Sequence, residues 1–329
     1  MFGRLATLVA LGMFIWAAPA QAQTQPASYP SRAITFIVTA AAGGVSDVVA
    51  RALGQQLADV WGQQVVIENR GGAAHVAGAA SVARAAPDGY TLLVAEAGTF
   101  TINPIIYPKG RLPYDEARDF APITGLVQIN QALVTSNALG VKTVGELIEL
   151  ANKKPGTITY GTAGVGSAGH TNIILLESLT GIKLVPVHSR GAALALNDIM
   201  AGHINAMSIS IGLVQGPAKT GQLTLLGVGS KDRMKLAPEF PTVAESGVPG
   251  FEAITWFGLF GPAALPREIV MKLNDAARKI FADAAFEEKF LAPQMFQPMI
   301  DTPERFAEFI KADIERWGKV IRAANIRVE

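Results

Sequence analysis

Cysteine is absent from this chain of 329 residues. Without a thiol the protein can form no disulfide, no thiolate metal site and no cysteine nucleophile. If it is exported, it must rely on its hydrophobic core for stability. The length suffices for such a core, and because it is about twice that of a typical domain it favours two domains.

An excess of positive charge is also absent, since 28 Lys and Arg residues face 27 Asp and Glu residues. A nucleic-acid-binding protein is expected to show a basic excess or a basic stripe. We therefore expect no nucleic-acid partner. Beyond the N-terminal region no second run of 18 apolar residues appears, so no membrane-spanning helix is expected there.

Histidine is scarce, and its spacing indicates no metal site. The four histidines are His75, His170, His188 and His203. They form no H-x-H, H-x3-H or H-E-x-x-H pair, and a lone histidine is more often structural or exposed than a ligand. The sequence therefore predicts no metal ion and no cofactor.

Residues 1–22 have the three-part pattern of a secretory signal peptide. Arg4 is their one charged residue, an apolar run covers residues 5–17, and Ala20-Gln21-Ala22 offers a small-x-small cleavage site. The alternative is an N-terminal membrane anchor, which would need roughly 20 apolar residues. We expect this segment to be cleaved and the protein to be periplasmic.

Short β-rich runs alternate with amphipathic segments along the chain. The runs of strand length are residues 34–38, 65–67, 91–95, 157–160, 184–187, 204–210 and 223–228. A helical pattern covers residues 48–60, with Ser46 as its N-cap, and another covers residues 306–321, with Thr302 as N-cap. This alternation predicts an α/β fold with mostly parallel sheets covered by helices on both faces.

A first glycine-rich loop, residues 39–47 (TAAAGGVSD), leads from an expected strand into an expected helix. Its glycines let the backbone approach a ligand closely. The helix start behind it offers free N–H groups and positive partial charge, which suit a carboxylate or a phosphate. The same sequence pattern would also be expected of a plain strand-to-helix turn with a serine cap and no ligand.

A second loop, residues 160–170 (YGTAGVGSAGH), matches the G-x-G-x-x-G dinucleotide fingerprint through Gly164, Gly166 and Gly169. The acidic residue expected after the next strand is missing, because His188 stands there. The lysine of a phosphate-binding P-loop and the spacing of a serine nucleophile elbow are missing too. What remains is a second helix start with N–H and hydroxyl donors.

Three blocks of sequence are distinctive. The first is residues 239–264 (EFPTVAESGVPGFEAITWFGLFGPAA); the second is residues 29–38 (YPSRAITFIV) with 43–47; the third is residues 86–93 (APDGYTLL) with 101–104 (TINP). Together they resemble the Bug-type receptors, the solute-binding proteins of tripartite tricarboxylate transporters. The resemblance extends from about residue 29 to the end of the chain.

The resemblance implies a two-domain periplasmic binding protein of the Venus-flytrap kind, each domain a mostly parallel sheet flanked by helices. Domain 1 would comprise residues 23–123 and 249–329, and domain 2 would comprise residues 124–248. The chain would cross between them near residues 122–125 and 247–250. In this family the first loop holds a ligand carboxylate, partly through ordered water.

Some positions depart from the usual family pattern. Thr39 and Ala42 stand where the family has prolines around the ligand loop. His188 and Ser189 replace a proline and an aromatic residue, which implies a ligand different from the commonest ones. Ile209 stands where many relatives carry an aspartate suited to an ammonium group, which argues against an amino-acid ligand.

The candidate ligand-binding residues combine the two loops with the positions that the resemblance implies. They are Ala42, Gly43, Gly44, Ser46, Asp47, Thr99, Thr162, Gly166, Ser167, Ala168, His188, Ser189, Ser208 and Ser210. Asp47 is expected to orient its loop rather than to face an anion. Trp256 and Phe257 are expected to pack in the core or at a hinge.

These features predict an extracytoplasmic solute receptor and not an enzyme. We expect it to bind a small organic carboxylate in the interdomain cleft and, as a monomer, to deliver it to the membrane components of a transporter. Two alternatives stay open: an exported α/β enzyme (a hydrolase or an NAD(P)-type oxidoreductase) and a ligand-binding partner of a sensor. The missing thiol, metal pairs and nucleophile elbow disfavour the enzyme.

Overall fold

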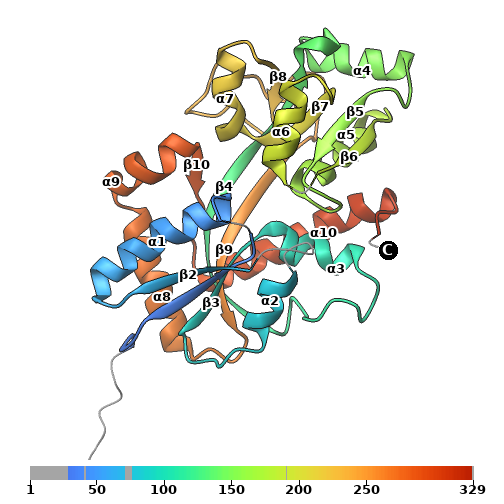
Figure 1. The fold of residues 1–329 in the computed structure, drawn as a ribbon. Coiled ribbons are helices and arrows are strands. Elements are labelled where there is room, and N and C mark those ends of the chain that lie inside the picture. Colours follow the sequence, from blue (N-terminus) through green and yellow to red (C-terminus); the bar gives the residue numbers. More distant parts are fainter. Residues whose placement is uncertain (1–28, 41, 71–75, 190, 328–329) are drawn as a thin grey trace, which may run out of the picture.

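The computed structural model describes residues 29–40, 42–70, 76–189 and 191–327. They form two lobes that long strands connect, as Figure 1 shows. The expected signal peptide lies outside the described residues, as do His75 and Arg190.

Lobe 1, the lower part of Figure 1, contains both ends of the described chain. Its elements from the first half of the chain are β1 (Ile34–Val38), α1 (Val45–Trp61), β2 (Val65–Asn69), α2 (Val76–Ala83), β3 (Thr91–Glu96), the π-helical turn η2 (Gly98–Ile102) and α3 (Asn103–Ile106). Its elements from the end of the chain are β9 (Ile254–Pro262), α8 (Arg267–Phe281), α9 (Ala284–Phe286), η4 (Glu287–Leu291), η5 (Ala292–Gln294), β10 (Phe296–Pro298) and α10 (Pro303–Ala323).

Lobe 2, the upper part of Figure 1, is built from the middle of the chain. Its elements are η3 (Asn137–Leu139), α4 (Val144–Lys153), β5 (Thr159–Thr162), α5 (Ala168–Thr180), β6 (Val185–His188), α6 (Ala192–Met200), β7 (Ala206–Ser210), α7 (Ile211–Lys219) and β8 (Leu223–Val228). The long strand β4 (Phe120–Ser136) runs through both lobes.

The strands form one continuous sheet in the order β2-β1-β3-β9-β4-β7-β5-β6, with β8 and β10 also paired to β4. The outer strands of each lobe are parallel: β1 pairs with β2 and β3, and β5 pairs with β6 and β7. The pairs made by β4 and β9 are antiparallel. This is the expected two-lobed α/β fold, with an antiparallel centre where the lobes meet. The parallel strands of both lobes end at this junction.

β4 passes from lobe 1 into lobe 2 between Asn130 and Gln131. Up to Asn130 it pairs with β9, and from Gln131 onward it pairs with β7. The Gln131 N–H donates to the carbonyl of Ala253, immediately before β9 begins. Strand pairing therefore does not change at residues 122–125, where a crossing was expected. That segment pairs with β9 through an irregular register inside lobe 1.

Each lobe has hydrophobic cores on both faces of its part of the sheet. In lobe 1 one core packs against α1 and α8, and the other against α2 and the first half of α10. In lobe 2 the corresponding helices are α4 with α5, and α6 with α7. Val248 and Phe251 pack in the core that contains α4 and α5. That core also includes Ile102 and Ile106 of lobe 1, so the crossing expected near residues 247–250 stays a prediction.

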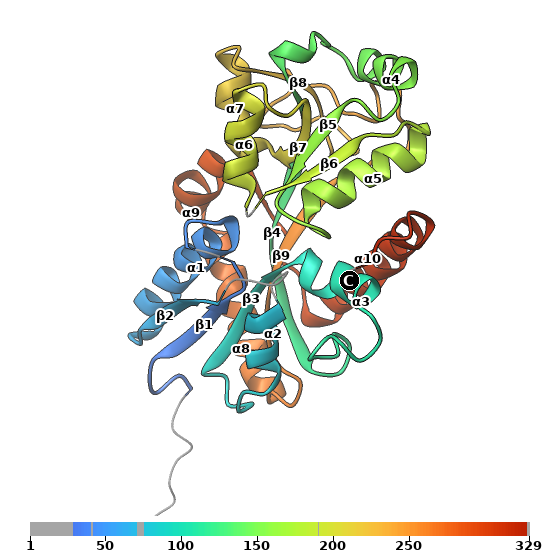
Figure 2. The same cartoon turned by 45° about the vertical axis from the view of Figure 1, so that its right-hand side comes forward.

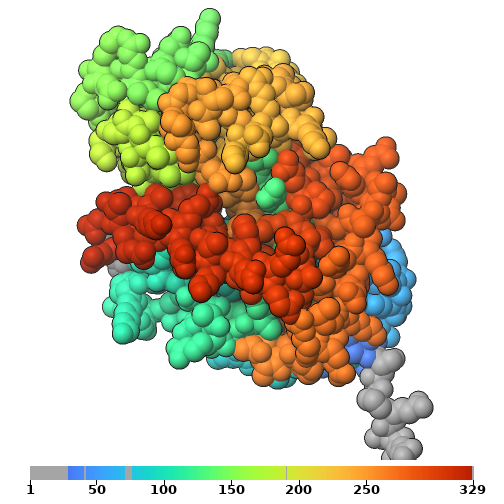
Figure 3. Space-filling model, turned by 180° about the vertical axis from the view of Figure 1, so that it is seen from behind, coloured from blue at the N-terminus to red at the C-terminus, as the bar shows by residue number. Residues whose placement is uncertain are grey.

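Helix α10 packs on both lobes. Phe306 and Ile310 in its first half lie in a lobe 1 core. Trp317 and Ile321 in its second half lie in the core that contains α4 and α5 of lobe 2, together with Ile102 and Ile106 of lobe 1. Figure 2 shows the second half of α10 beneath α5. From behind, the C-terminal residues, in dark red, lie directly under lobe 2 (Figure 3). α10 therefore braces the two lobes on one side of the crossing strands.

Local sequence signals predicted several features correctly. Thr302 is the N-cap of α10, where its hydroxyl accepts the Arg305 N–H at 3.3 Å. Trp256 and Phe257 are buried. The seven expected strands are all present, with ends displaced by at most two residues. β4, β9 and β10 were not anticipated.

Candidate ligand-binding site

The loop before α1 is held by the carboxylate of Asp47. This side chain is buried, and its Oδ2 accepts the Gly43 N–H at 2.9 Å. Arg51 donates to both carboxylate oxygens at 2.9 Å, and Asn69 donates to Oδ1 at 3.0 Å. Burial acts to raise the pKa of Asp47, but these hydrogen bonds outweigh it and hold the pKa below its usual value. The charge of Asp47 is thus engaged within lobe 1, where it shapes the loop.

The start of α1 differs in detail from the sequence prediction. Gly43 has the positive φ, +80°, whereas Gly44 has a φ of −73° and is the N-cap. Ser46 lies buried in the first helical turn, so the predicted serine cap is wrong. No side chain caps this helix. Its first N–H groups therefore need water or a ligand as acceptor. Ala42 and Gly43 beside them are exposed.

Thr99 lies in η2, the turn that follows β3. It is fully buried, and its carbonyl accepts the Tyr114 hydroxyl at 2.8 Å. Within the described part of the chain its own Oγ1 has no hydrogen-bond partner. An unpaired buried polar atom costs about 1–3 kcal/mol. Such atoms in a native fold call for an explanation, such as a bound water or ligand.

The loop before α5 is shaped by hydrogen bonds within itself. The Gly164 N–H donates to Thr162 Oγ1 at 3.0 Å, and the Ser167 hydroxyl donates to the Gly164 carbonyl at 2.7 Å. Ser167 occupies the N-cap position of α5 but makes no side-chain cap bond. Ala168 is the first helical residue. This second helix start therefore also presents N–H groups that no side chain caps.

Two histidines meet beside that loop. His188 Nδ1 lies 2.7 Å from Thr162 Oγ1, and its ring stands edge-on to that of His170 with centroids 5.1 Å apart. His170 Nδ1 accepts the Gly166 N–H at 3.1 Å, which leaves the proton of the neutral ring on Nε2. Burial, and then the neighbouring His188, lower the pKa of His170 to about 4. Burial also lowers the pKa of His188. Both rings are therefore mainly neutral at pH 7.

The remaining lobe 2 candidates lie at strand ends close to this group. The Ser189 N–H donates to the Thr162 carbonyl at 2.9 Å. Ser208 Oγ accepts the Asn172 Nδ2–H at 3.1 Å, and Ser210 occupies the N-cap position of α7. Ile209 between the two serines packs in a lobe 2 core.

Lobe 2 contacts lobe 1 closely at Gly166. A Cβ built on this glycine would lie 2.6 Å from the Ile106 side chain and 3.4 Å from that of Ile102. In Figures 1 and 2 the starts of α1 and α5 both lie at the level where β4 passes between the lobes. The structure thus gathers the lobe 2 candidates into one group. It places Thr99 and the loop of residues 42–47 in the other lobe, at the same junction.

A small cavity lies at the junction. Its volume is about 20 Å³, room for roughly one water molecule. Its walls come from both lobes and from the crossing strands, and include Gly98, Thr101, Gly166, Ala168, Thr255 and Trp317. Of the predicted site residues, all of which the structure describes, Gly166 and Ala168 line it.

Sequence reasoning missed the polar residues of the crossing strands. Gln131 Nε2 donates to Thr255 Oγ1 at 3.3 Å, beside the cavity. Asn130 next to it is 1% exposed, and neither polar atom of its amide has a partner among the described residues. A signal was present, because Gln128, Asn130 and Gln131 interrupt an apolar stretch in the middle of the strand.

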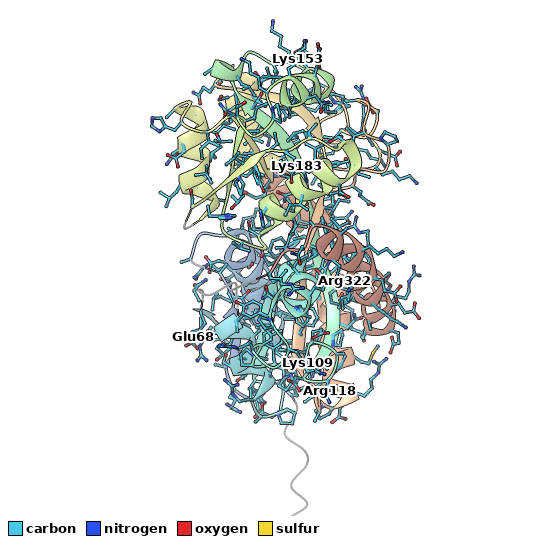
Figure 4. The ribbon with its side chains drawn as sticks, turned by 90° about the vertical axis from the view of Figure 1, so that its right-hand side faces the viewer. Glu68, Lys109, Arg118, Lys153, Lys183 and Arg322 are labelled. Carbon is cyan, nitrogen blue, oxygen red and sulfur yellow. The ribbon has the colours of Figure 1, made fainter. Side chains whose placement is uncertain are left out.

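Cationic side chains lie away from the cavity. The six charged residues labelled in Figure 4 are all exposed: Lys153 and Lys183 on lobe 2, and Glu68, Lys109, Arg118 and Arg322 on lobe 1. Among the described residues that line the cavity there is no Lys, Arg or His, and Glu96 is acidic. Within this cavity, as far as its described lining shows, an anion would therefore have to bind through neutral donors.

Neither a metal-ion cluster nor a membrane-spanning helix is found among the described residues. No three His, Asp or Glu side chains in it are placed to hold a metal ion. None of its helices has both the length and the apolar character that a membrane span requires.

Comparison with known proteins shows one matching family and three similar proteins. The family model described as "Tripartite tricarboxylate transporter family receptor" matches residues 49–326. Protein BugT of Bordetella pertussis is 31% identical, over 98% of this chain and 98% of its own. A protein of R. palustris solved with adipate is 30% identical with a TM-score of 0.84, covering 91% of this chain and 99% of that one. MatC from Rhodopseudomonas palustris with bound malate is 29% identical with a TM-score of 0.78, covering 89% of this chain and 100% of that one.

Proposed function

Because this chain belongs to the tripartite tricarboxylate transporter receptor family, we propose that it binds a small dicarboxylate between its lobes and delivers it to the membrane components of such a transporter. Members of this family are solute receptors, not enzymes. The choice of a dicarboxylate is supported by the two related receptors that hold adipate and malate.

The two uncapped helix starts are the observation that carries the proposal. α1 has 17 residues and α5 has 13, so both are long enough for their N-termini to carry a substantial partial positive charge. Neither start has a side-chain cap bond, and each follows a glycine with positive φ, Gly43 or Gly166. Backbone donors at such positions bind carboxylates without a cationic side chain. One carboxylate at each loop would use both lobes.

Binding requires the lobes to move. A cavity of about 20 Å³ is far smaller than an acid of several carbons, and ligand sites usually measure about 300–1,000 Å³. We place the hinge at Gln131 in β4 and at Ala253 just before β9, where the strand partners change. Domain 1 then comprises residues up to 130 and from 254, and domain 2 comprises residues 131–253.

The cellular setting follows from the family. Relatives of known structure are periplasmic receptors. Residues 1–22 would then be the export signal, removed on the way to the periplasm. The receptor would act there as a monomer, with the membrane components of the transporter as its protein partners.

Calorimetry of the purified mature protein tests the proposal. The panel contains acetate and benzoate as monocarboxylates, malate and adipate as dicarboxylates, and citrate as a tricarboxylate. We expect a dicarboxylate to bind most tightly and to raise the melting temperature. A ligand at one hundred times its dissociation constant stabilises the fold by about 2.7 kcal/mol. Binding of no acid on the panel, or sustained conversion of a bound acid to product, would contradict the proposal.

A further inference from the structure

We infer that His188 takes up a proton when a dicarboxylate binds, so that the affinity of this receptor for its ligand rises as the pH falls. The inference rests on the proposed function, because it concerns a ligand in the same cleft. It starts from the hydrogen bonds that join His188, Thr162 and His170.

His188 stands where a ligand can reach it. It is the last residue of β6, paired with Thr162 at the end of β5, and these parallel strands end at the lobe junction. The residue is exposed. Its Nδ1 is turned toward Thr162, so Nε2, on the opposite edge of the ring, is the nitrogen left to meet a ligand.

The Thr162 hydroxyl can serve both protonation states of His188. Its oxygen already accepts the Gly164 N–H at 3.0 Å, and the Gly164 carbonyl lies 3.4 Å away. When His188 is neutral, the hydroxyl donates to Nδ1 and the ring carries its proton on Nε2. When His188 is charged, Nδ1–H donates to the hydroxyl oxygen, and the hydroxyl proton turns to the Gly164 carbonyl. Rotation of the one buried Thr162 hydroxyl is therefore enough to accommodate the proton added at Nδ1 of His188.

His170 is unable to take that proton in its place. Its Nδ1 is occupied by the Gly166 N–H, so a proton there would leave this amide without its acceptor. It is 7% exposed and stacks on Tyr160. A charge on each of two rings 5.1 Å apart would also be repulsive. Of this pair, proton uptake is confined to His188.

Two acidic groups on the described elements around β6 are engaged elsewhere. Glu177 of α5 accepts the Leu184 N–H at 2.7 Å, just before the first residue of β6 and therefore at its opposite end. Asp198 of α6 lies 3.8 Å from His203. Partial desolvation of the ring is what lowers the pKa of His188, although the residue as a whole is exposed, and no charged group in the described chain contributes. A ligand carboxylate at Nε2–H would thus be the first anion against this ring.

The sign of the pH effect follows from linkage. In the free receptor the pKa of His188 lies below its ordinary value, and a carboxylate against the ring raises it. Between the pKa of the free receptor and the higher pKa of the complex, binding takes up a proton. Affinity then rises as pH falls through this window, by at most tenfold per pH unit for one proton.

Calorimetry with malate and adipate between pH 6 and pH 8 tests the inference. Titrations in two buffers of different ionisation enthalpy give the number of protons taken up. We expect uptake approaching one proton per ligand and an association constant that rises severalfold per pH unit as the pH falls. In His188→Gln the side-chain N–H can still donate but cannot gain a proton, so the slope should be lost.

Controls separate the inference from its premise. His203→Gln removes an exposed histidine outside the cleft and should keep the full slope. Thr162→Ser retains the hydroxyl and should keep the slope, whereas Thr162→Val should reduce it. Binding without proton uptake, or an unchanged slope in His188→Gln, would overturn the inference while the proposed function stands. If neither acid binds at any pH, the proposed function fails and the inference fails with it.

Discussion

At the residue scale, Gly43 and Asp47 act as one unit. The Asp47 carboxylate fixes the Gly43 N–H, and Arg51 and Asn69 fix the carboxylate. The loop that leads into α1 is therefore preorganised by a charge that it does not present to a ligand. Preorganised donors bind an anion with less ordering cost than a loop that must first fold around it.

Replacing Gly43 by alanine should weaken dicarboxylate binding and lower stability modestly. No atom lies within 4 Å of the added Cβ, so space is not limiting. The backbone conformation is limiting instead, because Gly43 has a φ of +80° and a non-glycine residue in the left-handed region costs about 1–2 kcal/mol. The loop is expected to relax and displace its N–H donors. Dissociation constant and urea unfolding are measured on the same preparation.

Gly62→Ala is the matched control. Gly62 has a φ of +64°, equally open surroundings, and a place at the other end of α1. It should lose a similar amount of stability and bind normally. Equal losses of affinity in both variants would mean that the Gly43 loop has no special role.

Asp47→Asn should destabilise the protein most at neutral pH, by about 1.5–3 kcal/mol, the usual range for hydrogen bonds to a charged group. The pKa of Asp47 is lowered in the folded state. Such a carboxylate stabilises the fold above its unfolded pKa, and this contribution is lost as the pH falls through the folded pKa. The difference in unfolding free energy from the wild type should therefore shrink below about pH 4. A constant difference from pH 7 to pH 3 would show that the charge is unimportant.

At the element scale, α10 has two attachments. Its Asp313 accepts the Trp256 Nε1–H at 2.8 Å, and Arg316 donates to Asp313 at 3.0 Å and to the Glu252 carbonyl at 3.3 Å. Glu252 immediately precedes Ala253, where we place the return of the chain from lobe 2 to lobe 1. The helix is thus bonded to the segment that must bend if the lobes rotate, and beyond Arg316 it packs under lobe 2.

Trp317→Ala should cost about 3–5 kcal/mol of stability, the usual range for truncating a large buried aromatic side chain. Trp317 is 4% exposed and packs in the core that α4 and α5 share with Ile102 and Ile106 of lobe 1, so its loss loosens the second half of α10 at the lobe junction. Phe309→Ala on the same helix is the comparison, since Phe309 is 38% exposed and should cost only about 1 kcal/mol. Urea unfolding measures both. Similar costs would argue against a bracing role.

The elements that the sequence predicted are those whose signal is local. Strands β1 and β8 and the Thr302 cap of α10 could be read from short runs of residues. β4 could not, because Pro122 and two register shifts break its alternation and three polar residues lie near its middle. Each half of that strand also pairs with a different lobe, so its length reflects contacts with β9 and β7 that lie far away in sequence.

The candidate site was predictable to a similar extent. Both glycine-rich helix starts exist, since strand, glycine and helix follow one another directly in the chain. Which glycine has the positive φ depends on the Asp47 bond to Gly43, and Ser46 is buried in the helix instead of capping it. Asn130, Gln131 and Thr255 join the junction only through tertiary pairing. No local pattern could have placed them there.

At the scale of the whole molecule, one side of the lobe junction is braced by α10. The crossing strands β4 and β9 adjoin that side, so the proposed rotation would change the distance between the start of α1 in lobe 1 and the start of α5 in lobe 2. The absence of cysteine makes this motion convenient to measure, because dyes can be attached at introduced cysteines alone.

A double variant with Lys153→Cys and Arg118→Cys carries one dye on the outer surface of each lobe (Figure 4). Saturation with adipate should change the energy-transfer efficiency, because the lobes rotate relative to each other. The pair Glu68→Cys and Arg118→Cys lies within lobe 1 and should show no change. An unchanged signal in the first pair, with binding proven by calorimetry, would indicate a rigid site.

The order in which the sheet is assembled also constrains how the chain folds as it is made. From Gln131 to Val228, lobe 2 has its segment of β4 and all of its other strands in one stretch of the chain. Lobe 1 needs β9 between β3 and β4, and the β3–β9 pair joins residues 93–96 to residues 257–260. Closing so long a loop delays that pairing. Strands β1 to β3 emerge first, yet their sheet is completed last. During that interval the edge of β3 that will later pair with β9 is exposed to wrong partners. In the sequence, the already folded lobe 2 separates the two segments that together form lobe 1.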